Sequence, residues 1–187
     1  VTSRLVDHGL IIVESIDSVA TGVLVVRAHG LSPRLIADAE SRGIDIVDTT
    51  CGIVKNVQST AARLITDNYA VIIAGEPEHP EVKSIYGYSQ EKGTICSSVD
   101  DLKRMDLSGK VGIVSQTTFS ESTYKAMIQY LAADSFTELR VFDTLCRSIT
   151  KRSNAAMKVA AEAEVMIVIG RFMSSNTKRL CEVCRKI

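Results

Sequence analysis

The sequence predicts an α/β fold in which similar lobes, built on mainly parallel sheets, surround a shared site. Short β-branched runs alternate with helical patterns along all 187 residues, which is typical of parallel α/β architecture. One unit also occurs twice. Cys51 ends IDIVDTTC and Cys146 ends LRVFDTLC, each before a helical segment, and 24 residues after each cysteine an apolar run ends at Gly75 or Gly170. Two thiols in matching places, 95 residues apart, indicate one shared site.

Each element follows from its local pattern. Runs rich in Val and Ile predict strands at 10–13, 23–26, 44–47, 70–74, 94–96, 111–114, 139–142 and 165–169. The first helix begins after the N-cap residue Ser32, has Pro33 at its first position and ends before Gly43. Apolar periodicity predicts further helices at 53–67, 80–88, 121–133, 147–163 and 175–186.

The repeat predicts three lobes, at 1–51, 52–142 and 143–187, with each cysteine at a junction. We expect the first and third lobes to be incomplete, because the chain opens on Val1 instead of Met and stops inside an amphipathic helical pattern. The sequence therefore predicts an internal piece of a longer protein.

Bulk properties exclude several classes of partner. The 22 basic and 22 acidic residues cancel without a long run of either sign, which argues against a nucleic-acid-binding face. No apolar run approaches the roughly 20 residues that span a bilayer. No secretory signal opens the chain, so its five cysteines favour thiols, ligands or nucleophiles over disulfides. We expect a cytoplasmic protein without nucleic-acid or membrane partners.

The predicted strand ends carry polar groups that suit one site. In open α/β sheets, ligands bind beyond the carboxyl ends of the strands. Those positions hold two imidazoles, two thiols, a carboxylate, hydroxyls and an amide: His29, Cys51, His79, Glu81, Thr117, Thr118, Cys146, Ser174, Ser175 and Asn176. Hydroxyls and an amide at a helix start suit a phosphate, and a carboxylate near two thiolates suits a proton donor.

Each feature alone also has a purely structural interpretation. Ser-Ser-Asn can cap a helix, a lone cysteine can pack as a small apolar residue, and HPE can be a helix entry. We assign Cys96 to strand packing, and Cys181 and Cys184 to a core-facing helix stripe rather than a metal or redox pair. Two rival functions remain at this point: a binding module for a phosphorylated metabolite, and a zinc hydrolase with Glu81 as base.

Taken together, the motifs resemble the LytB/IspH family of 4-hydroxy-3-methylbut-2-enyl diphosphate reductases. The matching stretches, in the family's order, are RAHGLSP (27–33), VDTTC (47–51), HPEV (79–82), SQTT (115–118), DTLC (143–146) and SSNTKRL (174–180). The resemblance implies that Cys51 and Cys146 ligate a cluster and that Glu81 delivers a proton. It also implies that His29, His79 and Thr117 contact substrate, and that Ser174, Ser175 and Asn176 hold its diphosphate.

The resemblance further implies a 4Fe–4S cluster held by three cysteines, fed by ferredoxin or flavodoxin. The reaction would remove a hydroxyl reductively to give isopentenyl and dimethylallyl diphosphates, in the non-mevalonate isoprenoid pathway. The family's first cysteine and a further histidine would lie upstream of Val1, so we expect this chain alone to be inactive. Departures from the family pattern at Gly52, Ile149, Ser153 and Met173 leave a divergent homologue without activity as an alternative.

Overall fold

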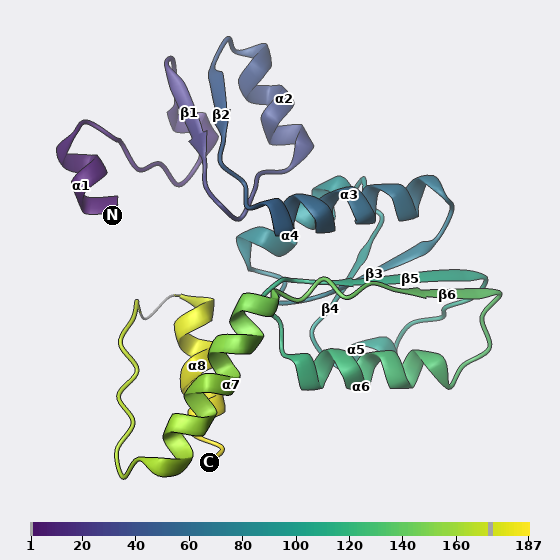
Figure 1. Ribbon diagram of the computed structural model, residues 1–187. Helices are drawn as coiled ribbons and strands as arrows, with labels where there is room; N and C mark the ends of the chain where they lie inside the picture. The colour runs from purple at the N-terminus through teal and green to yellow at the C-terminus, as the bar shows by residue number, and fades with distance from the viewer. Residues whose placement is uncertain (1, 172–173) are drawn as a thin grey trace.

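The computed structural model describes residues 2–171 and 174–187, so Val1 and the departure at Met173 lie outside the described residues. Its strands form two parallel sheets, which confirms the predicted α/β class. The smaller sheet pairs β1 (Val23–Val26) with β2 (Asp45–Asp48), and α2 (Pro33–Ser41) connects them. A short α1 (Thr2–Asp7) and a 3-10 turn, η1 (Ile16–Ser18), precede this unit, which lies at the top of Figure 1.

The larger sheet has four strands in the order β4-β3-β5-β6. These strands are β3 (Ala70–Ala74), β4 (Thr94–Cys96), β5 (Lys110–Ser115) and β6 (Glu138–Val141). The helices α3 (Gly52–Thr66) and α4 (Pro80–Tyr88) cover one face. The helices α5 (Val99–Leu102) and α6 (Glu121–Ala132) cover the other face, as Figure 1 shows.

The central strand β3 supplies side chains to two hydrophobic cores. Val71 and Ile73 point to the face covered by α3 and α4, while Ile72 and Ala74 point to the face covered by α5 and α6. All four are almost fully buried. Successive side chains on a strand alternate between faces, so a strand covered on both faces has a continuous apolar run such as AVIIA.

The strand order places a topological switch point between β3 and β5. From β3 the chain crosses through α4 to β4 on one side, and it then returns through α5 to β5 on the other side of β3. The connections that leave the carboxyl ends of β3 and β5 run through α4 and α6 on opposite faces of the sheet, so the chain diverges at this edge and forms a crevice. Ligand sites of doubly wound sheets form at such a crevice.

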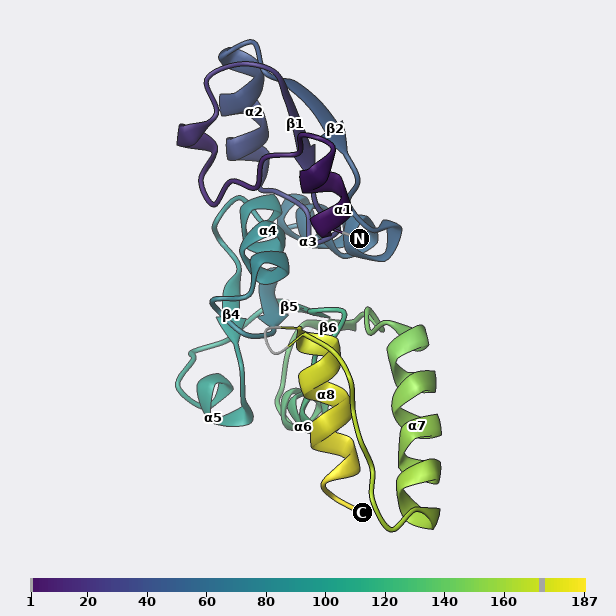
Figure 2. The same cartoon turned by 90° about the vertical axis from the view of Figure 1, so that its left-hand side faces the viewer.

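The last part of the chain is helical. Helices α7 (Arg147–Glu162) and α8 (Ser175–Cys184) pack against each other, and Figures 1 and 2 show them below the smaller sheet. No helix among the described residues is long and apolar enough to cross a membrane.

Two of the predicted strands are wrong. Residues 10–13 and 165–169 form no strand, and the side chains of Ile11, Ile167 and Ile169 are 81%, 76% and 94% exposed. A β-branched run favours extended backbone, but a strand also needs a neighbour for its hydrogen bonds. Within the described part of the chain neither segment has such a neighbour, so the second copy of the repeated unit forms without its closing strand.

Helix boundaries agree closely with the predicted ones. Helix α2 begins at Pro33 after Ser32, and Gly43 follows it with φ +71°, the left-handed conformation that glycine adopts without strain. Ser32 holds the N-cap position, but its side chain makes no capping hydrogen bond. Cys96 is buried at the end of β4, in agreement with its predicted packing role.

Candidate active site

At the switch point, the end of β3 lies very close to the first turn of α4. Gly75 follows β3, and a Cβ atom there would lie 2.6 Å from Cγ2 of Val82 in α4. The Gln116 side chain, just after β5, accepts a hydrogen bond from the backbone N–H of Glu76 at 3.1 Å. The start of α4 is therefore held tightly against the ends of both strands.

Glu81 lies in the first turn of α4 and is only 2% exposed. Its carboxylate accepts two hydrogen bonds from Thr117, one from the backbone N–H at 2.6 Å and one from the hydroxyl at 3.0 Å. Burial raises the pKa of Glu81, and the two hydrogen bonds from Thr117 partly oppose that rise. The crevice thus contains a carboxyl group that holds its proton to higher pH than an exposed glutamate, beside a hydroxyl able to relay it.

His79 is the N-cap residue of α4 and has a defined tautomer. Its Nδ1 accepts a hydrogen bond from the backbone N–H of Glu81 at 3.2 Å, so the ring hydrogen sits on Nε2. From there it donates to Oγ of Ser175 at 2.9 Å. Burial, followed by the charges of His29, Arg27 and Lys178, lowers the pKa of His79 to about 4. The imidazole is therefore a neutral hydrogen-bond donor near pH 7.

His29 faces His79 in an edge-to-face arrangement. The ring centroids are 5.3 Å apart and the ring planes are 82° apart. Burial and the charge of Arg27 lower the pKa of His29 as well. Its buried Nδ1 has no hydrogen-bond partner among the described residues. A buried imidazole nitrogen without a partner is a group that a polar ligand would satisfy.

The two repeated cysteines occupy matching positions. Cys51 is the N-cap residue of α3 and Cys146 is the N-cap residue of α7, and neither thiol makes a capping hydrogen bond. The backbone N–H of Cys51 donates to the carbonyl of Ala28 at 3.0 Å, and that of Cys146 donates to the carbonyl of Thr117 at 2.8 Å. Both thiols are free and reachable by solvent at helix N-termini.

These contacts join most of the predicted site residues into one path. The backbone of Cys51 is hydrogen-bonded to Ala28, the residue before His29, and the His29 ring faces His79. His79 accepts a hydrogen bond from the backbone of Glu81, and Glu81 accepts hydrogen bonds from Thr117. The carbonyl of Thr117 then accepts a hydrogen bond from the backbone of Cys146. The path runs from the backbone of Cys51 to the backbone of Cys146.

The predicted diphosphate residues lie at the start of α8. Ser175 reaches His79, while Ser174 caps the helix by accepting a hydrogen bond from the backbone N–H of Thr177 at 3.4 Å. Asn176 is exposed on the first turn. The structure therefore brings Ser175 into the path of contacts and leaves Asn176 facing solvent.

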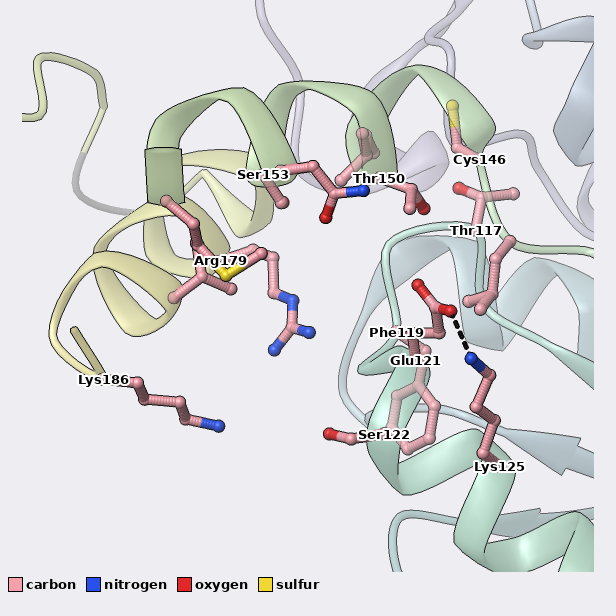
Figure 3. A pocket seen from close by; sticks show the side chains of 15 residues that line it. Thr117, Phe119, Glu121, Ser122, Lys125, Cys146, Thr150, Ser153, Arg179 and Lys186 are labelled. Atoms are coloured by element: carbon pink, nitrogen blue, oxygen red, sulfur yellow. Dashed lines mark ion pairs between the residues drawn. The ribbon is translucent and has the colours of Figure 1, made fainter. Parts of the chain in front are cut away.

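A cavity of about 310 Å³ lies beside this path, between α6 and the pair α7 and α8 (Figure 3). Thr117 and Cys146 line it, together with two of the departures from the family pattern, Ile149 and Ser153. In Figure 3 the guanidinium group of Arg179 points into the cavity. Arg179 was not among the predicted site residues, although it follows Ser175 by four residues and so shares a face of the helix.

The thiols have the donor chemistry of an iron–sulfur ligand set, because a soft thiolate is the usual protein ligand of such clusters. Cys51 and Cys146 are both free, and neither is used for capping. Within residues 2–171 and 174–187, no group of three or more His, Cys, Asp or Glu side chains lies close enough together to hold one metal ion. Cys51 and Cys146 therefore have the donor chemistry of cluster ligands, and the described residues bring no third donor beside them.

Comparison with known proteins identifies the family. Residues 1–187 match the family model described as LytB protein. A 4-hydroxy-3-methylbut-2-enyl diphosphate reductase from Geobacter sulfurreducens is 36% identical over 187 residues, and one from Pelobacter propionicus is 33% identical. Each match covers 100% of this chain and 66% of the relative, so the chain spans about 66% of the length of these relatives.

Solved structures agree with the sequence matches. The E-1-hydroxy-2-methyl-but-2-enyl-4-diphosphate reductase from Plasmodium falciparum superposes with a TM-score of 0.90 at 26% identity, covering 98% of this chain and 59% of that one. A (E)-4-hydroxy-3-methyl-but-2-enyl diphosphate reductase gives a TM-score of 0.74 at 29% identity, covering 98% of this chain and 66% of that one. With the whole chain matched by the family model, the chain belongs to the LytB protein family.

Proposed function

We propose that this chain forms the substrate- and cluster-facing part of a 4-hydroxy-3-methylbut-2-enyl diphosphate reductase. The three proposed lobes, 1–51, 52–142 and 143–187, would surround a 4Fe–4S cluster that Cys51 and Cys146 help to hold. The observation that carries the proposal is the path of contacts between the backbones of these two cysteines, with the buried Glu81 carboxyl group at its centre. Membership in the family and the names of its relatives support the same reaction.

The reaction is a reductive dehydroxylation that consumes two electrons and two protons. One proton leaves with the hydroxyl group as water, and the other ends on the carbon skeleton of the product. A bound cluster would supply the electrons one at a time from ferredoxin or flavodoxin. The remaining tasks, which are binding, orientation and proton delivery, fall to side chains of this chain.

Glu81 is the proposed proton donor. Because burial raises the pKa of its carboxyl group, the protonated form persists to higher pH than it would in water. The Thr117 hydroxyl lies 3.0 Å from a carboxyl oxygen and can pass a proton from Glu81 to a leaving hydroxyl group. A donor with a raised pKa also avoids placing a carboxylate charge against an anionic substrate.

The imidazoles and the α8 hydroxyls are the proposed diphosphate and alcohol contacts. Nε2 of His79 carries a hydrogen and can exchange Ser175 for a phosphate oxygen, and the unpartnered Nδ1 of His29 can accept from a hydroxyl group. The N-terminus of α8 adds backbone N–H groups that favour an anion. Ser174, Ser175 and Asn176 would then form the diphosphate cradle.

The decisive experiment measures substrate binding and turnover separately, in variants of the full-length product of the gene that encodes this chain. Glu81→Gln preserves size but cannot deliver a proton. We expect unchanged cluster content, substrate affinity within about tenfold, and turnover reduced roughly 100-fold or more. Ser174→Ala and Asn176→Ala should weaken binding and leave turnover less affected. A Glu81→Gln protein that turns over substrate at the wild-type rate would refute the proposed donor.

Iron analysis tests the proposed ligands. After anaerobic reconstitution, Cys51→Ser and Cys146→Ser should each lose iron and sulfide, because a serine oxygen is a poor replacement for a soft thiolate. Cys181→Ala is the matched control, since this thiol also lies on a helix but outside the path of contacts, and it should cost only about 1 kcal/mol of stability. Phosphate binding without bound iron in the unmodified protein would favour the alternative, a non-redox phosphometabolite-binding module.

A further inference from the structure

The His29 ring has a defined orientation, although its buried Nδ1 makes no hydrogen bond to the described residues. Nδ1 of His29 has no partner among the described residues, yet the ring lies in a defined edge-to-face contact with His79. The backbone around it is well fixed. The N–H of Gly30 donates to the carbonyl of Arg27 at 3.0 Å, and the carbonyl of Ala28 accepts from Cys51. The position of the ring therefore depends on what holds this loop.

The loop rests on a buried polar pair. Nε2 of Gln58 in α3 donates to Oγ of Ser84 in α4 at 2.7 Å, and the two residues are 4% and 2% exposed. Gly30, with φ +79°, lies directly over this pair. A Cβ atom on Gly30 would be 2.3 Å from Nε2 of Gln58, 2.9 Å from Oγ of Ser84 and 3.3 Å from Cγ2 of Thr50. Only a glycine permits this approach.

A second glycine, one helical turn further along α4, also lies in close contact with the same loop. A Cβ atom on Gly87 would lie 2.5 Å from Cβ of Ser32 and 3.3 Å from Cδ of Pro33. Residues 84 and 87 are three apart and share a face of α4. The segment from Gly30 to Pro33 thus lies along one face of the helix that begins after His79 (Figure 1).

We propose that this packing of the loop on α3 and α4 positions His29 against His79. It consists of two contacts, Gly30 on the Gln58–Ser84 pair and Gly87 against Ser32. The four residues Gly30, Gln58, Ser84 and Gly87 are positioning residues, because they act on the imidazoles through the loop and through α4. The consequence for catalysis rests on the proposed function, whereas the positioning itself is a property of the folded chain. Sequence patterns alone gave these residues no role.

The test is the titration of the imidazoles by NMR in the 187-residue chain, without cluster or substrate. The chain has three histidines, so His8, in an exposed turn, is an internal control. Gly30→Ala should separate the rings, so that the inter-ring NOE is lost. The pKa of His79 should then rise from about 4 toward the ordinary value of 6.5, as the ring loses burial and the neighbouring charges of His29 and Arg27. The charge of Lys178, which also acts on His79, comes from α8 and should be unchanged.

Gly43→Ala is the matched control for backbone strain. Gly43 has φ +71°, close to that of Gly30, but no atom lies within 4 Å of a Cβ built there. It should lose comparable stability through the left-handed backbone and leave the titrations of His29 and His79 unchanged. The same shift in Gly43→Ala as in Gly30→Ala would overturn the proposal, because strain rather than contact would then be the cause.

A second substitution tests the contact itself. Adding Gln58→Ala to Gly30→Ala removes the nearest clashing atom, and the pKa of His79 should move back toward the wild-type value. If Gly30→Ala does not fold, Gly87→Ala presses on the same segment from the other end and should also weaken the inter-ring NOE. Unchanged imidazole titrations in folded Gly30→Ala or Gly87→Ala would refute the positioning role. Because no activity is measured, loss of the proposed reductase function would leave these results intact.

Discussion

The buried carboxyl group of Glu81 should make stability depend on pH in a way that a single substitution removes. The carboxyl group has an ordinary pKa near 4.5, and burial raises that pKa in the folded chain. The folded state therefore binds the proton more tightly than the unfolded state. The resulting stability is complete below pH 4.5 and is lost as the pH rises through the folded-state pKa.

Glu81→Gln keeps the shape but has no titration. The amide oxygen can accept from the Thr117 N–H, and the amide nitrogen can donate to the Thr117 hydroxyl oxygen, so both contacts survive as neutral hydrogen bonds. At pH 4 the two proteins should differ by no more than about 1 kcal/mol, the usual net value of one such bond. At pH 8 the glutamine variant should be the more stable of the two.

Glu81→Ala measures how much the contacts of the Glu81 side chain contribute to the free energy of unfolding. It leaves the buried N–H of Thr117 without an acceptor, at a cost of about 1–3 kcal/mol, and it removes a buried methylene group worth about 0.8 kcal/mol. We therefore expect a loss of roughly 2–4 kcal/mol at pH 7. Urea unfolding of all three proteins between pH 4 and pH 8, followed by circular dichroism, measures these differences. If the glutamine variant were less stable than the wild type at pH 8, the carboxylate would be net stabilised and the argument from burial would be wrong.

Two further predictions concern stability. Because the pKa of His79 falls from 6.5 to about 4 on folding, its contribution to stability is present above pH 6.5 and is lost as the pH drops toward 4. His79→Asn keeps a helix-capping oxygen and should flatten this part of the profile in urea titrations, whereas an unchanged slope would assign it to other groups. Gly112→Ala places a Cβ atom 2.7 Å from Cδ2 of the fully buried Leu64, and should cost about 1–3 kcal/mol in the same assay. A neutral Gly112→Ala would show that this core can relax.

Local patterns at the strand ends were enough to predict that several candidate site residues lie together. Parallel strands end at one edge of a sheet, so the residues that follow β3, β5 and β6 had to lie near one another. The same patterns could not show that Glu81 bonds to Thr117, because that pairing depends on the strand order 4-3-5-6, which local periodicity does not encode. The repeat placed Cys51 and Cys146 at helix starts, and the structure confirms both positions.

The errors have one physical cause. Residues 10–13 and 165–169 have the composition of strands, and Ile169 is as β-prone as any residue in β3. Composition describes what a segment prefers and does not describe which neighbour it pairs with. His79 shows the same limit, because its side chain caps α4 and also reaches Ser175 in α8, a contact that no short window of sequence contains.

The hydrogen bond between His79 and Ser175 joins residues 96 positions apart, and the bond between Glu81 and Thr117 joins residues 36 positions apart. Closing such long loops costs chain entropy before any contact compensates for it, so distant pairs tend to form late in folding. The helices and the sheet can be complete while the crevice between them is still open. We therefore expect Ser175→Ala to speed unfolding and to leave the folding rate unchanged, which stopped-flow measurements of both rates would test. The order of assembly would then leave the space between α4 and α8 open to an incoming group until the contact between His79 and Ser175 forms.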